Sequence, residues 1–295
     1  MTGASGFIGS TARRVLTAAG HLVIPLARKG GAGGEASWDP ENGLLDVGVL
    51  RGCDAVVHLA GHSAASQRRW DETHKARIRD SRVNGTRLLA ETMARMAQPP
   101  SVFVCASATG FYGHRGDEWL DESSSSGKGF LAEVCREWEA AAQPARAAGV
   151  RVVHLRIGVV LGAGGGALAQ MLPWFRWGLG GRLGDGRQWW SWVTVEDTAK
   201  IILFALQHPE LSGPVNTVSP EPVTNAEFTR ILADVLHRPA FLPAPAFLLR
   251  ALYGEMADEL LLTSARVRPA ALTKSGYQFA HPPLKAALQA CLQSR

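Results

Sequence analysis

The chain alternates short, nearly continuous apolar runs with longer segments whose apolar residues recur every three or four positions. The apolar runs, which predict buried strands, lie at residues 21–28, 53–61, 101–108 and 150–162. Helical spacing is found at residues 10–19, which end at Gly20, at about 70–96 and at 127–142. Apolar strands that alternate with helices indicate a parallel sheet covered on both faces, which is an α/β fold.

The composition changes after Gly162: glycine, proline and tryptophan become frequent, and the predicted helices become short. We therefore predict a main domain over residues 1–236 with an insertion at about 163–192. A separate C-terminal segment is expected over residues 237–295. Neither an internal repeat nor a linker is visible.

Composition indicates an ordinary globular protein without membrane-spanning segments. The 295 residues are 46% hydrophobic and 19% charged, with a net charge of +5, as in an ordinary globular protein. The four cysteines form no C-x-x-C pair, so we expect reduced thiols and no metal site. Because no apolar run is long enough for a bilayer and no signal peptide pattern is seen, we expect a cytoplasmic protein without a membrane partner.

A glycine pattern opens the chain. The segment TGASGFIG places Gly3, Gly6 and Gly9 three residues apart at the start of a helix. Glycines allow a tight turn and let backbone N–H groups approach a pyrophosphate, which the N-terminus of the helix attracts. A glycine-rich turn without a ligand is the alternative.

The first strand of such a fold normally carries several apolar residues before this turn, whereas only Met1 and Thr2 precede Gly3. A central strand this short leaves its neighbours unpaired. Either the natural chain starts upstream of Met1, which we favour, or the fold tolerates a truncated central strand. We expect that a few apolar residues restored before Met1 complete the strand and raise the melting temperature.

Several segments resemble the extended short-chain dehydrogenase/reductase superfamily, which contains the nucleotide-sugar epimerases. They are TGASGFIG, HLAG (58–61), SATGFYG (107–113), LRIGVVLG (155–162) and SWVTVEDTA (191–199). A narrower set resembles the atypical SDR39U1 or YfcH-like branch of epimerase family proteins: RRW (68–70), SRVNGT (81–86), WEAAA (138–142) and TNAEF (224–228). Residues 247–279 resemble the C-terminal domain of unknown function of that branch. The resemblance implies a Rossmann-type doubly wound sheet with a smaller C-terminal α/β region on the substrate side.

Cofactor preference is predicted from Arg28. In such folds an acid at the end of the second strand binds the ribose of NAD, whereas an arginine there accommodates the 2′-phosphate of NADP. Here Arg28 and Lys29 end that strand, and no carboxylate follows until Glu35. We therefore expect NADP(H), with a solvated Arg-Lys pair as the alternative. The resemblance implies that the cofactor contacts Gly3, Ser5, Gly6, Phe7, Ile8, Gly9, Ala27, Arg28, Leu59, Ala60, Gly61, Arg77, Arg82 and Val160.

The helix at residues 68–87 is rich in arginine, a feature that also occurs in proteins that bind nucleic acid. Acidic residues interrupt the basic stripe, and no aromatic residues are interleaved for base stacking. We expect a solvated helix with one face on the cofactor and no nucleic-acid partner.

The helix at residues 127–142 lacks the usual catalytic pair of this superfamily, Tyr-x-x-x-Lys. One register places Leu131 and Cys135 at the two positions, and a shift by one places Phe130 and Val134 there. Ser107 and Tyr112 are the candidate catalytic residues that remain, although Tyr112 is equally well explained as a packed aromatic. The acids that follow, Asp117, Glu118, Asp121 and Glu122, are better explained as loop or cap residues.

On the substrate side, Arg182, Arg187 and Gln188 are candidates for contact with a polar substrate, and Trp189, Trp190 and Trp192 for its wall or for the core. We predict an NADP(H)-dependent oxidoreductase that acts on an unidentified small carbonyl or sugar-like substrate. The alternative is a non-catalytic NADP(H)-binding redox sensor. A monomer or a homodimer is expected.

Overall fold

The computed structural model describes residues 1–28 and 36–293 of the chain. Its main sheet contains four parallel strands in the order β11 (Gly213–Thr217), β7 (Arg151–Ile157), β5 (Val102–Ala108) and β4 (Ala55–His58). A second group joins β1 (Leu26–Arg28), β2 (Ala36–Asp39) and β3 (Leu44–Leu45), in which only the β2–β3 pair is antiparallel. The predicted loop at residues 30–37 falls mostly outside the described residues.

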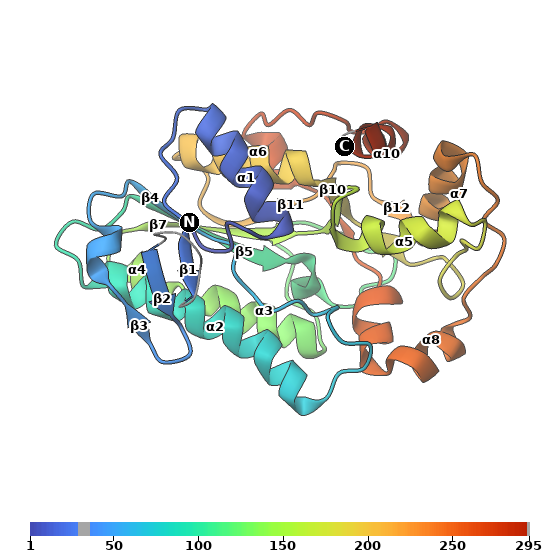
Figure 1. The fold of residues 1–295 in the computed structure, drawn as a ribbon, viewed down its shortest axis with the longest axis horizontal. Helices are drawn as coiled ribbons and strands as arrows, with labels where there is room; N and C mark the ends of the chain where they lie inside the picture. The colour runs from blue at the N-terminus through green and yellow to red at the C-terminus, as the bar shows by residue number, and fades with distance from the viewer. Residues whose placement is uncertain (29–35, 294–295) are drawn as a thin grey trace.

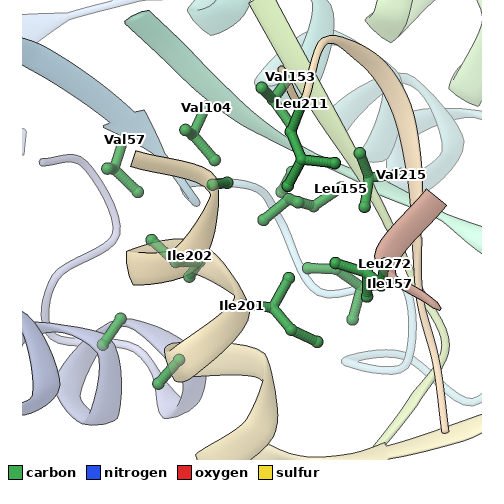
Figure 2. Packing of buried hydrophobic residues seen from close by; sticks show 14 of the residues in the cluster. Val57, Val104, Val153, Leu155, Ile157, Ile201, Ile202, Leu211, Val215 and Leu272 are labelled. Atoms are coloured by element: carbon green, nitrogen blue, oxygen red, sulfur yellow. The ribbon is translucent and has the colours of Figure 1, made fainter. Parts of the chain in front are cut away.

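Helices cover both faces of the sheet (Figure 1). On one face lie α1 (Phe7–Ala18) and α6 (Val195–Gln207); on the other lie α2 (Glu72–Ala94), α3 (Phe130–Ala140) and α4 (Gln143–Ala147). Figure 2 shows Ile202 of α6 on the side of Val57 and Val104, and Ile201 on the side of Ile157 and Leu272. Burial of both sheet faces explains the continuous apolar runs, and the predicted α/β fold with a doubly wound parallel sheet is confirmed.

Thr2 alone takes the place of a central strand. Its amide donates to Val57 O (3.0 Å), and the amide of Leu26 donates to Met1 O (2.8 Å), so one residue bridges β4 and β1. The Thr2 side chain is fully buried and lies 2.6 Å from Nδ1 of His58. The stabilising effect expected from added apolar residues stays a prediction.

Two predicted strands differ from the observed ones. Of residues 21–28, only Leu26–Arg28 form β1, because the neighbouring N-terminal segment offers only Thr2 as a bridge partner. Leu22, outside this strand, is 89% exposed. The run at residues 150–162 divides at Gly158 into β7 and β8 (Val159–Leu161), and β8 pairs instead with β10 (Trp192–Thr194). A side chain at Gly158 would collide with Ser191 O, so glycine permits the crossing.

The remaining elements gather at one end of the molecule, beyond the carboxyl ends of the main strands (Figure 1). They include α5 (Gly166–Arg176), α7 (Asn225–Leu236) and α8 (Ala246–Tyr253), with β9 (Trp189–Trp190) paired to β12 (Val223–Thr224). A π-helical turn, η3 (Ala257–Leu261), precedes β13 (Arg266–Val267), and β13 pairs with β6 (Trp119–Leu120). The last two elements are α9 (Ala270–Lys274) and α10 (Leu284–Gln293). The predicted boundary at residues 236 and 237 stays a prediction. Among the described helices none is both long and apolar enough to span a membrane.

Candidate cofactor site

The turn between Thr2 and α1 is built from glycines that have no room for a side chain. Gly3 has a φ of +66°, and a Cβ there would lie 2.8 Å from the carbonyl carbon of Leu59. A Cβ on Gly9 would collide with Gly3 O. Gly6 caps α1, whose first turn carries no acidic residue, so its free N–H groups face an approaching anion without competition.

Phe7 and Ile8 were predicted to contact the cofactor, but their side chains turn into the protein. The Phe7 ring sits against Gly162, Gly165 and Gly166, where a Cβ would lie 2.7, 2.6 and 3.0 Å from ring atoms. Ile8 and Val160 pack on the main core. These residues therefore offer backbone atoms and shape to a ligand, and Ser5 is exposed beside them.

The end of β4 lies directly beside this turn. Thr2 Oγ1 is 3.2 Å from the amide of Leu59 and 3.3 Å from that of Ala60, and these hydrogen bonds fix the two residues. The side chain of Arg82 lies over Gly61, where a Cβ would be 3.5 Å from Arg82 Cγ. The predicted residues 59–61 and 82 are thus brought together next to the glycine turn.

Cationic side chains from two elements, β1 and α2, act on His62. Burial is the main cause that lowers the pKa of His62, and the charges of His74, Arg77, Arg82 and Arg28 lower this pKa further. Arg82 Nη1 donates to the carbonyls of His62 (2.8 Å) and Ile78 (2.9 Å). No ion pair with a described residue is formed by any of the three arginines, so their charge is not compensated within this part of the chain.

Sequence reasoning missed His62. The available signal was its position directly after the HLAG segment, which was expected to line the cofactor. Its ring lies 3.3 Å from Nδ1 of His74 and 3.2 Å from the hydroxyl of Ser66.

The inner face of α3 is filled by packing. Residues Leu131 and Cys135 lie against the turn η2 (Thr109–Tyr112), where a Cβ on Gly110 would be 3.4 Å from Leu131 Cβ. Burial raises the pKa of Cys135 to about 12, so this thiol stays protonated at neutral pH. Neither position carries a group that exchanges protons with a substrate.

Ser107 and Tyr112 belong to one buried network. Ser107 Oγ donates to Glu139 Oε1 (2.7 Å), and Arg156 donates to both carboxylate oxygens of Glu139 (2.9 Å each). Arg156 Nη1 also donates to the Tyr112 hydroxyl (3.0 Å), which lies 2.7 Å from Asn216 Oδ1. Tyr112 has no exposed surface, and burial raises its pKa.

The structure thus brings the two predicted catalytic residues into one cluster, but both hydroxyls are bonded inside the protein. Glu139, Arg156 and Asn216, which complete the cluster, were not predicted. The WEAAA segment contains Glu139 and was the only signal available for it.

Several of the predicted substrate-side residues bond or pack within the protein. Gln188 donates to the carbonyls of Leu183 (3.1 Å) and Leu261 (3.0 Å), and Trp190 and Trp192 are in the core. Trp189 is less buried: its indole N–H donates to Asp117 (2.7 Å), and the guanidinium of Arg266 stacks on its ring at 3.9 Å. Arg187 is exposed.

The predicted loop acids also have structural partners. Glu118 pairs with Arg115 (2.6 Å) and Asp121 with Arg268 (2.7 Å), while Glu122 accepts from the amides of Asn216 (3.0 Å) and Ala271 (3.1 Å). Across the described residues, no three His, Cys, Asp or Glu side chains come together as a metal site would require.

The C-terminal segment contacts the first turn of α3. The carboxylate of Glu259 accepts hydrogen bonds from the amides of Phe130 (3.2 Å) and Leu131 (3.1 Å). Burial raises the pKa of Glu259, although the two amides act in the opposite direction. Beside it, Lys75 of α2 pairs with Glu255 (3.1 Å). A carboxyl from the C-terminal segment is therefore held next to the position of the missing tyrosine.

Comparison with known proteins decides the family. The model of the NAD-dependent epimerase/dehydratase family matches residues 1–218, and a domain of unknown function, DUF1731, matches residues 244–291. The chain belongs to the NAD-dependent epimerase/dehydratase family. The predicted resemblance is confirmed, since the chain is 38% identical to the human epimerase family protein SDR39U1, over 97% of both proteins. It is 45% identical to the epimerase family protein Mb2239 of Mycobacterium bovis, covering 98% of this chain and 95% of that protein.

Solved structures of this family agree. Human SDR39U1, isoform 2, crystallised with NADPH, has a TM-score of 0.91 at 36% identity and covers 100% of this chain and 98% of that one. The nucleoside-diphosphate sugar epimerase of Corynebacterium glutamicum has a TM-score of 0.82 at 39% identity, covering 99% of this chain and 57% of that one.

Proposed function

We propose that this family member is an NADP(H)-dependent oxidoreductase that acts on a small carbonyl or sugar-like substrate. The observation that carries the proposal is the group of uncompensated arginines, Arg28, Arg77 and Arg82, around His62 beside the glycine turn. A relative of similar length and fold was crystallised with NADPH, which supports the same cofactor here.

The residues present fit such a cofactor. The amides at the start of α1 would bind the pyrophosphate, and Arg28 with Arg77 would bind the 2′-phosphate. Leu59, Ala60 and Gly61 would lie beneath the nucleotide, and Arg82 over Gly61 would add a further positive charge. When bound, the nicotinamide ring supplies hydride transfer.

Calorimetric titration with NADPH and NADH tests the cofactor. We expect NADPH to bind about 10- to 100-fold more tightly, because charge-assisted contacts to the 2′-phosphate contribute about 1.5–3 kcal/mol. Arg28→Ala should remove most of this preference and leave NADH binding unchanged. Arg87→Ala, at an exposed position on α2, is the control. Equal affinities of the wild type for both cofactors would contradict the proposal.

The source of the proton is tested with three conservative variants, Ser107→Ala, Tyr112→Phe and Glu259→Gln. The assay follows NADPH oxidation with a panel of quinones, enals and small carbonyls. If one of the three groups moves a proton, its variant should lose about 100-fold in turnover with nearly unchanged NADPH affinity. Glu259 is included because its carboxyl group lies at the first turn of α3, where burial raises its pKa.

A second function is favoured by the burial of both candidate hydroxyls: a redox sensor that binds NADP(H) without turnover. On that reading the wild type oxidises NADPH with none of the panel, and all three variants bind NADPH as the wild type does. Turnover by the wild type with any of these compounds would rule out the sensor.

A further inference from the structure

A surface cavity of about 620 Å³ lies at the end of the molecule that contains α7, away from the glycine turn. Its floor is one face of α7, formed by Ala226, Thr229 and Ala233. Three arginines line it as well: Arg182, Arg230 and Arg238. The opposite face of α7 carries Phe228 and Leu232, which are buried in the core.

Backbone contacts fix the walls of this cavity. His237 caps α7 with a left-handed φ of +52°, which turns residues 238–243 back toward the helix. The returning segment then runs beside residues 180–184: the amide of Leu242 lies 3.3 Å from Gly180 O, and that of Ala244 lies 2.9 Å from Arg182 O. A side chain on Gly181 would collide with Leu242 O, so the two segments are in close contact. The cavity is therefore part of the fold and does not arise from a loose loop.

No carboxylate lies within ion-pair distance of these three arginines in the described part of the chain. None of the three forms a side-chain hydrogen bond or an ion pair with any residue in the described ranges, 1–28 and 36–293. Asp234, one turn after Arg230, pairs with Lys285 (2.7 Å), which lowers the pKa of this carboxyl, and the charge of Arg230 lowers it further. Asp185 accepts from the amide of Arg187 (3.0 Å). Three guanidinium groups around one concave space favour an anion with several oxygens.

We propose that this cavity is a second anion site, which binds the phosphate groups of a soluble phosphorylated small molecule. Its volume lies in the range of small-molecule sites, and the planar guanidinium groups match phosphate oxygens. The Thr229 hydroxyl adds a further donor on the floor. Phe241 on the rim is 72% exposed and offers an apolar surface to the organic part of the ligand.

A phospholipid headgroup would present the same phosphate chemistry. Trp177, which is 82% exposed, lies close to this rim, because the adjacent Gly178 contacts Pro239. We assign the site to a soluble ligand because a concave space encloses a small molecule, whereas a flat bilayer surface would leave it unfilled. The experiment separates the two sources.

Calorimetric titration with inorganic pyrophosphate tests the site in the full chain. We expect saturable binding that weakens about 10-fold or more in Arg230→Ala and in Arg238→Ala, as expected for the loss of one charge-assisted contact. Arg187→Ala is the matched control, since this exposed arginine lies near the cavity but does not line it.

The absence of saturable binding would overturn the proposal. So would binding that both cavity variants retain at full strength, because the pyrophosphate would then occupy another site, such as the amides at the start of α1. Co-sedimentation with vesicles of phosphatidylglycerol, compared with phosphatidylcholine, tests the other source. We expect no binding to either; binding to phosphatidylglycerol that Arg230→Ala abolishes would assign the site to a lipid headgroup.

Discussion

Two regions at the carboxyl ends of the strands differ in whether their charged side chains have partners within the protein. Around His62, the charges of Arg28, Arg77 and Arg82 meet no acid among the described residues. Around Arg156, in contrast, the side chains of Glu139, Ser107, Tyr112 and Asn216 are joined to Arg156 and to one another by hydrogen bonds. We call these the open cluster and the sealed cluster.

This difference in partners assigns the two clusters different roles, ligand binding for the open cluster and stability of the fold for the sealed cluster. A cation that no carboxylate neutralises is available to an anionic ligand, whereas a buried ion pair has strict geometric requirements and holds two elements together. The sealed cluster links β5, η2, α3, β7 and β11, which are distant in sequence. Substitutions in the sealed cluster should therefore change stability, and those in the open cluster should change cofactor binding.

The largest effect is expected for Arg156→Met. This change leaves Glu139 buried without its partner, which costs about 3–5 kcal/mol of unfolding free energy. Arg79→Met is the matched control, because Arg79 and Glu137 form an exposed pair at 2.6 Å, which is worth at most about 1 kcal/mol. Urea unfolding measures the free energy of unfolding of both variants. Equal decreases would show that the buried ion pair stabilises the fold no more than the exposed one.

A smaller effect is expected from His58, which is buried next to Thr2. Burial lowers the pKa of His58 to about 3, so the folded protein does not take up the proton that the unfolded chain binds below pH 6.5. The contribution of His58 to stability should therefore be constant above pH 6.5 and fall by about 1.4 kcal/mol per unit as the pH decreases from there toward 3.

Urea unfolding between pH 7 and pH 5 checks this slope. His58→Gln should make it shallower without abolishing it, because burial also lowers the pKa of His154, to about 4. The exposed His21 provides the control, and a slope unchanged in His58→Gln would refute the assignment.

The smallest effect is expected at His62, and it rests on the proposed function. A phosphate bound beside His62 would raise its lowered pKa, so the complex would take up a proton. NADPH affinity should then increase a few-fold as the pH decreases from 7.5 to 6. Calorimetry on His62→Gln should show a flat profile, and a profile as steep as that of the wild type would place the titrating group elsewhere.

The sequence by itself determined the features that depend on local pattern. Buried parallel strands require continuous apolar runs, so the alternation of strands and helices predicted the α/β fold. The spacing of Gly3, Gly6 and Gly9 indicated a tight turn before a helix, and the structure has that turn. The missing tyrosine and lysine on α3 were also visible, because those positions are set by the helical register.

Only the tertiary structure decided which side chains meet. Tyr112 and Asn216 are 104 residues apart, and Phe130 lies 129 residues from Glu259, so no local pattern announces either contact. The same holds for Arg156. Its position in the sequence indicates only a residue of a buried strand, whereas in the structure it bonds to both Glu139 and Tyr112. Burial and partner choice depend on packing between elements, and for that reason the sequence located the candidate hydroxyls but could not show that the protein itself bonds them.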